Sequence, residues 1–144
     1  MTGVTAVIDT NVLLDLWVFE DRDAVPLRAA IESRAIAPWR SEAVIAELED
    51  VLARSSFGLD VGRRNEILRL WCRLAQPALE IRSAPWICSD RRDQMFLDLA
   101  YSVRADCLVT KDKALLQLAQ RARASGLTIT EPRHALERLP VRDA

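Results

Sequence analysis

The sequence predicts an α/β fold in which helices flank a mainly parallel sheet. Short apolar runs rich in β-branched residues alternate with amphipathic segments along the whole chain, a pattern typical of repeated βαβ units. The first run, Val4 to Ile8, is almost continuously apolar, as expected of a strand that is buried on both faces. A chain of 144 residues without internal repeats is long enough for one domain with a sizeable core.

Five segments are predicted as strands because they are short, apolar and bounded by polar or turn residues. In chain order they are Val4–Ile8, Ala35–Trp39, Leu79–Ile81, Cys107–Thr110 and Leu127–Thr130. A helical segment follows each of them, which is the arrangement that parallel strands require. We therefore expect a five-stranded sheet.

Seven segments are predicted as helices. Pro26 fits a first helical turn, Ser41 and Asp60 are suitable N-caps, and Gly126 is a suitable helix stop. The predicted helices are Val12–Val18, Val25–Arg34, Ser41–Arg54, Asp60–Gln76, Asp90–Arg104, Asp112–Ser125 and Pro132–Leu139. We therefore expect one domain over residues 1–139 and a short C-terminal tail over residues 140–144.

The composition is that of an ordinary soluble protein, with 50% hydrophobic and 28% charged residues. The net charge of −1 provides no overall attraction to nucleic acid. The three cysteines show no metal-ligand spacing, which indicates free thiols in a reducing compartment. No signal peptide and no apolar span of about 18 residues is present, so we expect a cytoplasmic protein without a membrane segment.

Acidic residues follow the predicted strands. Asp9 follows the first strand directly, Asp112 follows the fourth, and Asp93 lies in the first turn after the third strand and its loop. Because the carboxyl ends of parallel strands share one edge, we expect these three carboxylates to converge there. The third helix adds a fourth acid, either Glu47 or Glu49, which flank its apolar stripe on opposite sides.

Helical geometry distinguishes between the acids of the fifth helix. At 100° per residue, Asp93 projects on the side of Phe96 and Leu97, which must face the core, and Asp98 projects towards solvent. Asp90 lies where the chain enters the helix, so its carboxylate is expected to cap the first turn. A carboxylate on the buried side is costly unless it is paired or bound to a metal ion, which favours Asp93 as a ligand.

Three or four converging carboxylates cannot all remain ionised without a cation. Mg²⁺ and Mn²⁺ are the natural partners, since both prefer oxygen ligands. Such ions activate water for attack on phosphodiesters. The alternative is that each acid only stabilises the start of a helix, but their joint occurrence at one edge favours a metal site.

Four stretches together resemble the PIN-domain ribonucleases, and most closely the single-domain bacterial PIN proteins that are toxins of toxin–antitoxin pairs. They are Val7–Leu13, Ser41–Leu52, Asp93–Ala100 and Leu108–Asp112, and the resemblance spans about residues 4 to 132. It implies a three-layer fold with a mainly parallel five-stranded sheet in the order 3-2-1-4-5.

The resemblance also implies which residues form the site. The metal-binding acids would be Asp9, Glu47, Asp93 and Asp112, which favours Glu47 over Glu49. Asn11 and Thr110 match polar positions that orient those carboxylates. The chain departs from the family at Lys111, where relatives often carry Gly, and at Ala114, where many carry another acid. The number of bound metal ions therefore stays open.

The function that these features imply is a Mg²⁺- or Mn²⁺-dependent endoribonuclease that hydrolyses RNA with a metal-activated water. Its partners would be the RNA substrate and a cognate antitoxin protein. A homodimer is also expected, because the early helices carry more large apolar residues than one buried stripe requires. These residues are Leu14, Trp17, Val18 and Phe19.

Two other functions fit part of the pattern. A PIN-like module with weak catalysis would bind RNA or a protein partner, but the complete set of acids argues against it. An aspartate-nucleophile phosphatase needs a second Asp two residues after Asp9, where this chain has Asn11. A phospho-acceptor receiver needs an Asp at the end of the third strand, where the chain has a loop over residues 83–89.

Overall fold

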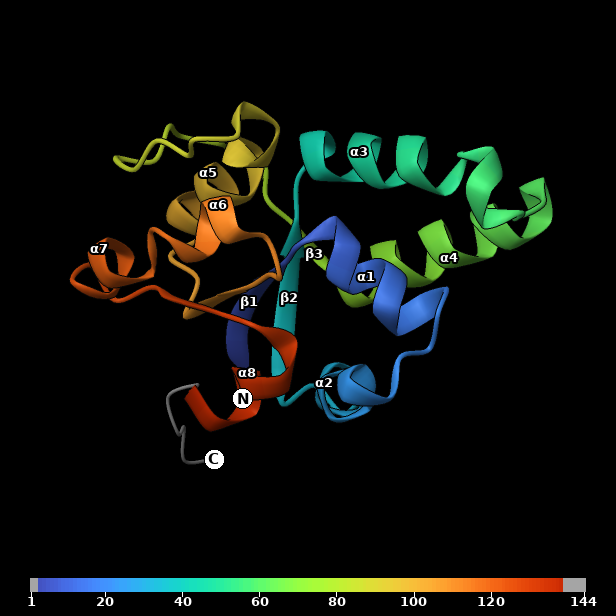
Figure 1. The fold of residues 1–144 in the computed structure, drawn as a ribbon, viewed down its shortest axis with the longest axis horizontal. Coiled ribbons are helices and arrows are strands. Elements are labelled where there is room, and N and C mark those ends of the chain that lie inside the picture. Colours follow the sequence, from blue (N-terminus) through green and yellow to red (C-terminus); the bar gives the residue numbers. More distant parts are fainter. Residues whose placement is uncertain (1–2, 139–144) are drawn as a thin grey trace.

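A five-stranded sheet lies between two layers of helices in the computed structural model, which describes residues 3–138 (Figure 1). The strands are β1 (Val4–Ile8), β2 (Ile36–Arg40), β3 (Gln76–Pro77), β4 (Cys107–Val109) and β5 (Thr128–Thr130). All four neighbouring pairs are parallel, in the order β3-β2-β1-β4-β5. The predicted fold class and strand order are confirmed, and the predicted tail over 140–144 lies outside the described residues.

The helices occur close to where the sequence predicts them. They are α1 (Thr10–Trp17), α2 (Val25–Glu32), α3 (Glu42–Leu52), α4 (Val61–Leu74), α5 (Gln94–Ser102), α6 (Lys113–Leu116), α7 (Ala119–Arg123) and α8 (Pro132–Arg138). Short 3₁₀ helices precede α2, α4 and α5, namely η1 (Arg22–Ala24), η2 (Ser55–Phe57) and η3 (Arg91–Asp93). No helix within residues 3–138 combines the length and hydrophobicity that crossing a bilayer requires.

The third strand is not where the sequence predicts it. The prediction of Leu79–Ile81 is wrong, because β3 comes directly after α4 and pairs with Trp39 and Arg40 of β2. Leu79 is instead 92% exposed. Strand β3 lies at the edge of the sheet and both of its residues are exposed, so it needs no apolar side chains. Its position is set by where the chain leaves α4.

The predicted sixth helix, Asp112–Ser125, is also wrong as one element, since it consists of α6 and α7 separated by a turn at residues 117–118. Leu115, Leu118 and Ala122 are all buried, so the helical spacing of the apolar residues continues across the turn. No Gly or Pro stands at the turn, and the sequence pattern therefore carries no sign of it.

The two helical layers bury two separate apolar clusters. Along β1, Ala6 and Ile8 face one cluster and Val7 faces the other, as the alternation of a strand requires. The first cluster lies under α1 to α4 and α8, and the second under α5 to α7. Figure 1 shows the same division, with α5, α6 and α7 to the left of the sheet.

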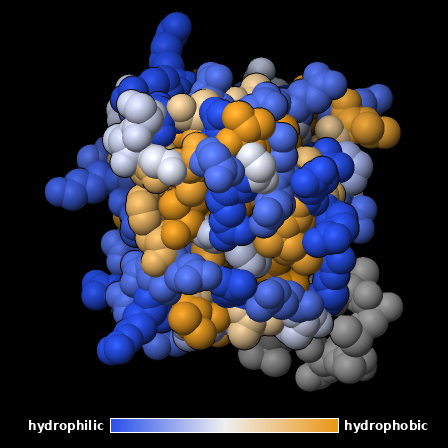
Figure 2. All heavy atoms as spheres, turned by 90° about the vertical axis from the view of Figure 1, so that its right-hand side faces the viewer, coloured by the Kyte–Doolittle hydropathy of each residue, from blue (hydrophilic) through white to orange (hydrophobic). Residues whose placement is uncertain are grey.

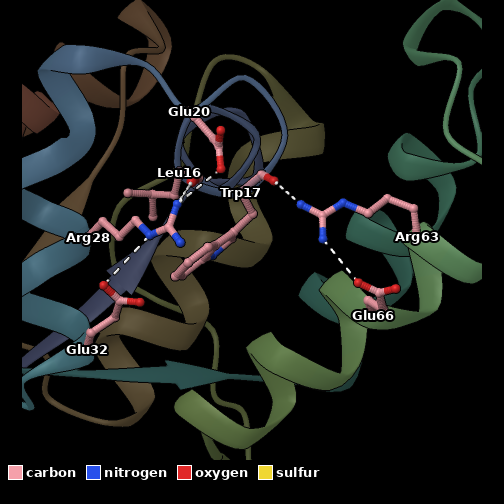
Figure 3. A network of polar contacts seen from close by, with 7 residues as sticks. All are labelled: Leu16, Trp17, Glu20, Arg28, Glu32, Arg63 and Glu66. Atoms are coloured by element: carbon pink, nitrogen blue, oxygen red, sulfur yellow. Dashed lines mark hydrogen bonds and ion pairs between the residues drawn. The ribbon is translucent and has the colours of Figure 1, made fainter.

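Two arginines fix the C-terminal end of α1 (Figure 3). Arg28 from α2 donates to the Leu16 carbonyl at 3.3 Å, and Arg63 from α4 donates to the Trp17 carbonyl at 3.1 Å. The Arg28 guanidinium also lies 4.6 Å from the centre of the Trp17 ring. These bonds satisfy carbonyls that a helix end leaves free, so α1 is held between its neighbours.

Candidate active site

The ends of β1 and β4 bring Asp9 and Thr110 together. Ile8 and Val109 are paired in register, so the residues that follow them are neighbours. Asp9 is only 3% exposed, and its Oδ2 accepts a 2.7 Å hydrogen bond from Thr110 Oγ1. The same hydroxyl oxygen accepts from the Asp112 backbone N–H at 3.0 Å. One threonine therefore orients Asp9 and the loop that carries Asp112.

The surroundings of Asp9 raise its pKa above the ordinary value of an aspartate. Burial raises the pKa of Asp9, and the negative charges of Asp112 and Glu47 raise it further. The hydrogen bond from Thr110 and the nearby backbone N–H of Asn11 lower the pKa of Asp9 and so offset part of this rise. The contact with Asn11 does not amount to helix capping, because the Asp9 side chain makes no capping hydrogen bond on α1. The alternative that Asp9 only caps the next helix is thus not supported.

Helix α3 brings Glu47 to the same edge. Its N-cap is Ser41, as predicted, and Ser41 Oγ accepts from the Val44 N–H at 3.3 Å. Glu47 is half-buried, and its Oε2 accepts a 2.8 Å hydrogen bond from Thr10 Oγ1 of α1. Glu49, the other candidate, is exposed. Of the two glutamates, Glu47 is the one in contact with the residues that follow β1.

Three further carboxylates form a tight group. Oxygens of Asp90, Asp93 and Asp112 all lie within 4.8 Å of one another. Asp93 Oδ2 is buried and has no hydrogen-bond partner among the described residues. Burial raises the pKa of Asp93 to about 8, helped by a hydrogen bond to Asp112 and by the charges of Asp112, Asp9 and Asp90. This raised pKa favours the protonated form of Asp93 when no cation is bound.

Asp90 occupies the capping position that the sequence predicts, and it also belongs to this group. Its Oδ1 accepts from the Arg92 backbone N–H at 3.0 Å, and its two oxygens bind the Arg92 guanidinium at 3.2 and 3.1 Å. The bonds to Arg92 lower the pKa of Asp90. The sequence predicts only a capping role for Asp90, although its Asp-x-x-Asp spacing with Asp93 is present there.

Asp98 does not project into solvent, so that prediction is wrong. It is half-buried, and its Oδ1 accepts from the Ala84 backbone N–H at 2.8 Å and from Gln94 Nε2 at 3.1 Å. Helix α5 begins at Gln94, and Asp93 is the last residue of η3 rather than part of the α-helical turn. Asp98 thus anchors the loop that leads to η3.

The remaining polar residues have separate roles. Lys111 Nζ forms an ion pair with Asp15 Oδ2, a carboxylate on α1 that is largely buried. Asn11 is exposed, and its contact with Asp9 comes from the backbone N–H. His134 lies on α8 and pairs with Glu137. Lys111, the departure from the family pattern, therefore balances a charge next to the acidic group.

Capping explains part of the acidic group but not all of it. Asp112 Oδ1 accepts from the Ala114 N–H at 2.9 Å and so caps α6. Asp93 makes no such cap hydrogen bond on α5, and its buried oxygen stays unpaired among the described residues. Mg²⁺ and Mn²⁺ prefer carboxylate oxygens as ligands. The group of Asp90, Asp93 and Asp112 offers such oxygens, one of them unpaired, so these residues fit a divalent cation.

A comparison with known families agrees with this geometry. The sequence model of the PIN domain matches residues 5–114, which include Asp9, Glu47, Asp93 and Asp112. No curated protein sequence matches the chain. The chain therefore belongs to the PIN-domain family, whose members are generally nucleases that use divalent metal ions.

Proposed function

We propose that the protein is a Mg²⁺- or Mn²⁺-dependent endoribonuclease and the toxin of a toxin–antitoxin pair. The observation that carries this proposal is the buried Oδ2 of Asp93, which has no partner among the described residues although the Asp93 side chain lies beside Asp90 and Asp112. An unpaired buried carboxylate oxygen beside other carboxylates destabilises the fold through desolvation and charge repulsion. A bound cation would offset this destabilisation.

The proposed ligands are Asp9, Glu47, Asp93 and Asp112. A bound divalent ion lowers the pKa of water and offsets the negative charge of a phosphodiester. The protein's side chains orient the ligands, and one of them releases a proton when the ion binds. Thr110 holds one oxygen of Asp9, Thr10 holds one oxygen of Glu47, and Asp93 must give up the proton that its raised pKa retains. Hydrolysis of RNA by this route would leave 5′-phosphate and 3′-hydroxyl ends.

Arg91 and Arg92 stand beside this site. Both side chains are exposed on η3, directly before Asp93. Arginine binds phosphate oxygens with two parallel hydrogen bonds, so either side chain suits the RNA backbone. Arg92 must release the Asp90 side chain to do so, while Asp90 Oδ1 still accepts from the Arg92 backbone N–H.

We propose that the chain self-associates, but through fewer of the apolar residues of the early helices than the sequence indicates. Leu14 and Trp17 are each only 3% exposed and belong to the core, whereas Phe19 is 56% exposed. Phe19 packs on Phe57 with ring centres 5.7 Å apart, and Val61 nearby in the chain is 61% exposed. Figure 2 shows hydrophobic atoms between hydrophilic side chains on the side of the molecule that carries α3 and α4. We propose this side for the homodimer and the acidic edge for the antitoxin.

The decisive experiment is RNA cleavage by the purified chain with Mg²⁺, Mn²⁺ or EDTA. We expect cleavage with either ion and none in EDTA. Glu47→Gln should abolish it, and Glu49→Gln, an exposed glutamate on the same helix, is the matched control. Equal cleavage in EDTA would overturn the metal mechanism. RNA binding without cleavage in any condition would favour the module with weak catalysis instead.

A further inference from the structure

A cavity lies at the same edge of the sheet as the acids. It has a volume of about 570 Å³ and lies between the start of α3, the loop after β3, and α5. Its lining includes Arg40, Ser41, Pro77, Leu79, Met95 and Asp98. We call it the α3–α5 pocket. Its volume falls in the range of pockets that bind small molecules.

The α3–α5 pocket adjoins the acidic site through shared elements. Arg40 and Pro77 are the last residues of β2 and β3, and β2 is the direct neighbour of β1, which Asp9 follows. Neighbouring strands are about 4.8 Å apart, so the pocket is roughly 5–10 Å from the end of β1 along the edge. A polymer bound at the acids can therefore place its next unit in this pocket.

The walls combine apolar surface with one cationic and one anionic group. Pro77, Leu79 and Met95 provide the apolar part. Arg40 Nε donates to the Ala75 carbonyl at 3.1 Å, and the guanidinium has no ion pair with any of residues 3–138. Asp98 engages only Oδ1 in the hydrogen bonds of the described part of the chain. Both groups thus keep capacity to bind a ligand.

This combination suits a nucleobase better than a phosphate. Two carboxylates, Glu42 and Asp98, line the pocket and disfavour an anion, while the apolar walls suit the face of a flat ring. Guanine offers O6 and N7 as acceptors to an arginine and carries an N2 amino donor for a carboxylate. Adenine has no carbonyl oxygen at the corresponding position.

We propose that the α3–α5 pocket binds a nucleobase of the RNA next to the scissile phosphodiester, with preference for guanine. Arg40 donates to the O6 and N7 edge, and Asp98 accepts from the ring and amino N–H groups. The identity of the polymer rests on the proposed function, but base binding by the pocket does not. The pocket would then be one determinant of where the nuclease cuts.

Binding of free nucleotides tests the pocket without any cleavage. The full chain in EDTA is titrated with GMP, AMP, CMP and UMP by calorimetry, and we expect GMP to bind most tightly. Asp98→Asn keeps an oxygen for the Ala84 N–H but loses the carboxylate, so GMP affinity should fall about 10-fold. Leu79→Ser, at a residue that is 92% exposed, should weaken all four nucleotides without unfolding the chain. Asp50→Asn, at an exposed residue of α3, is the matched control.

Mapping of cleavage ends separates the two proposals. We expect wild-type cuts to cluster beside guanines, and Asp98→Asn to lose this preference while it still cleaves RNA. Cleavage without base preference, together with equal binding of the four nucleotides or none, would overturn the base pocket and leave the nuclease proposal intact. Preferential GMP binding without any RNA cleavage would support the pocket and count against the nuclease.

Discussion

Thr110 Oγ1 donates a 2.7 Å hydrogen bond to Asp9 Oδ2 across the ends of two neighbouring strands. Thr110→Val keeps the shape but removes this bond, so Asp9 loses its orientation. Losing a residue that orients a metal ligand costs about 10- to 100-fold in metal affinity. We expect a loss of that size in Mn²⁺ binding by calorimetry. Thr110→Ser restores the hydroxyl and should bind nearly as well as wild type, and equal loss in both variants would contradict this role.

The acids should be needed for activity but not for folding. Asp9→Asn, Glu47→Gln and Asp112→Asn each remove one negative charge from a site where the carboxylates repel one another. We expect each variant to lose RNA cleavage and to keep or gain thermal stability in EDTA, as measured by calorimetric melting. A large loss of melting temperature in all three variants would indicate that the acids are mainly structural.

Asp90 and Asp93 should behave in opposite ways. Asp90 caps η3 and has both oxygens bound by Arg92, so Asp90→Ala should lower the melting temperature and keep most of the nuclease activity. Asp93 has the unpaired oxygen, so Asp93→Asn should keep its stability and lose metal affinity. Mn²⁺ titration and thermal melting of both variants check this pair, and the reverse pattern would show that Asp90 is the ligand.

Stability without metal should depend on pH through Asp93. Its pKa is about 8 in the folded chain against an ordinary value of 3.8, so the folded state holds the proton more tightly. Asp93 therefore contributes stability that is complete below about pH 4 and is lost as the pH rises to about 8. Denaturant unfolding in EDTA should show this fall, and Asp93→Asn should flatten it. A stability that rises through this range because of Asp93 would refute the assigned protonation.

Lys111 should support the fold through Asp15. The Asp15 side chain is 10% exposed, and Lys111→Ala leaves its charge without this partner. Removing one partner of a partly buried pair costs about 1–3 kcal/mol in the free energy of unfolding. The double variant with Asp15→Asn should recover much of this loss in denaturant unfolding. Weaker RNA binding by Lys111→Ala with unchanged stability would instead indicate a phosphate contact.

The sequence by itself determined the layers and the position of most elements. Val4–Ile8 and Cys107–Val109 are apolar on both sides, which requires helices on both faces of a parallel sheet. Asp9 follows its strand directly, so its place at the sheet edge is fixed by local chain geometry. Ser41 and Asp60 cap the helices that they were predicted to cap, because capping is also a local interaction.

Only the tertiary structure decided that Asp90 lies with Asp93 and Asp112, two of the acids that the sequence predicts to converge. The group of Asp90, Asp93 and Asp112 depends on how η3 packs against the end of β4, and no periodicity along one segment encodes that distance. The same holds for β3, whose position is set by its pairing with β2 at the sheet edge. Hydrophobic periodicity predicts which face of an element is buried. The distance between side chains of different elements is set by how those elements pack.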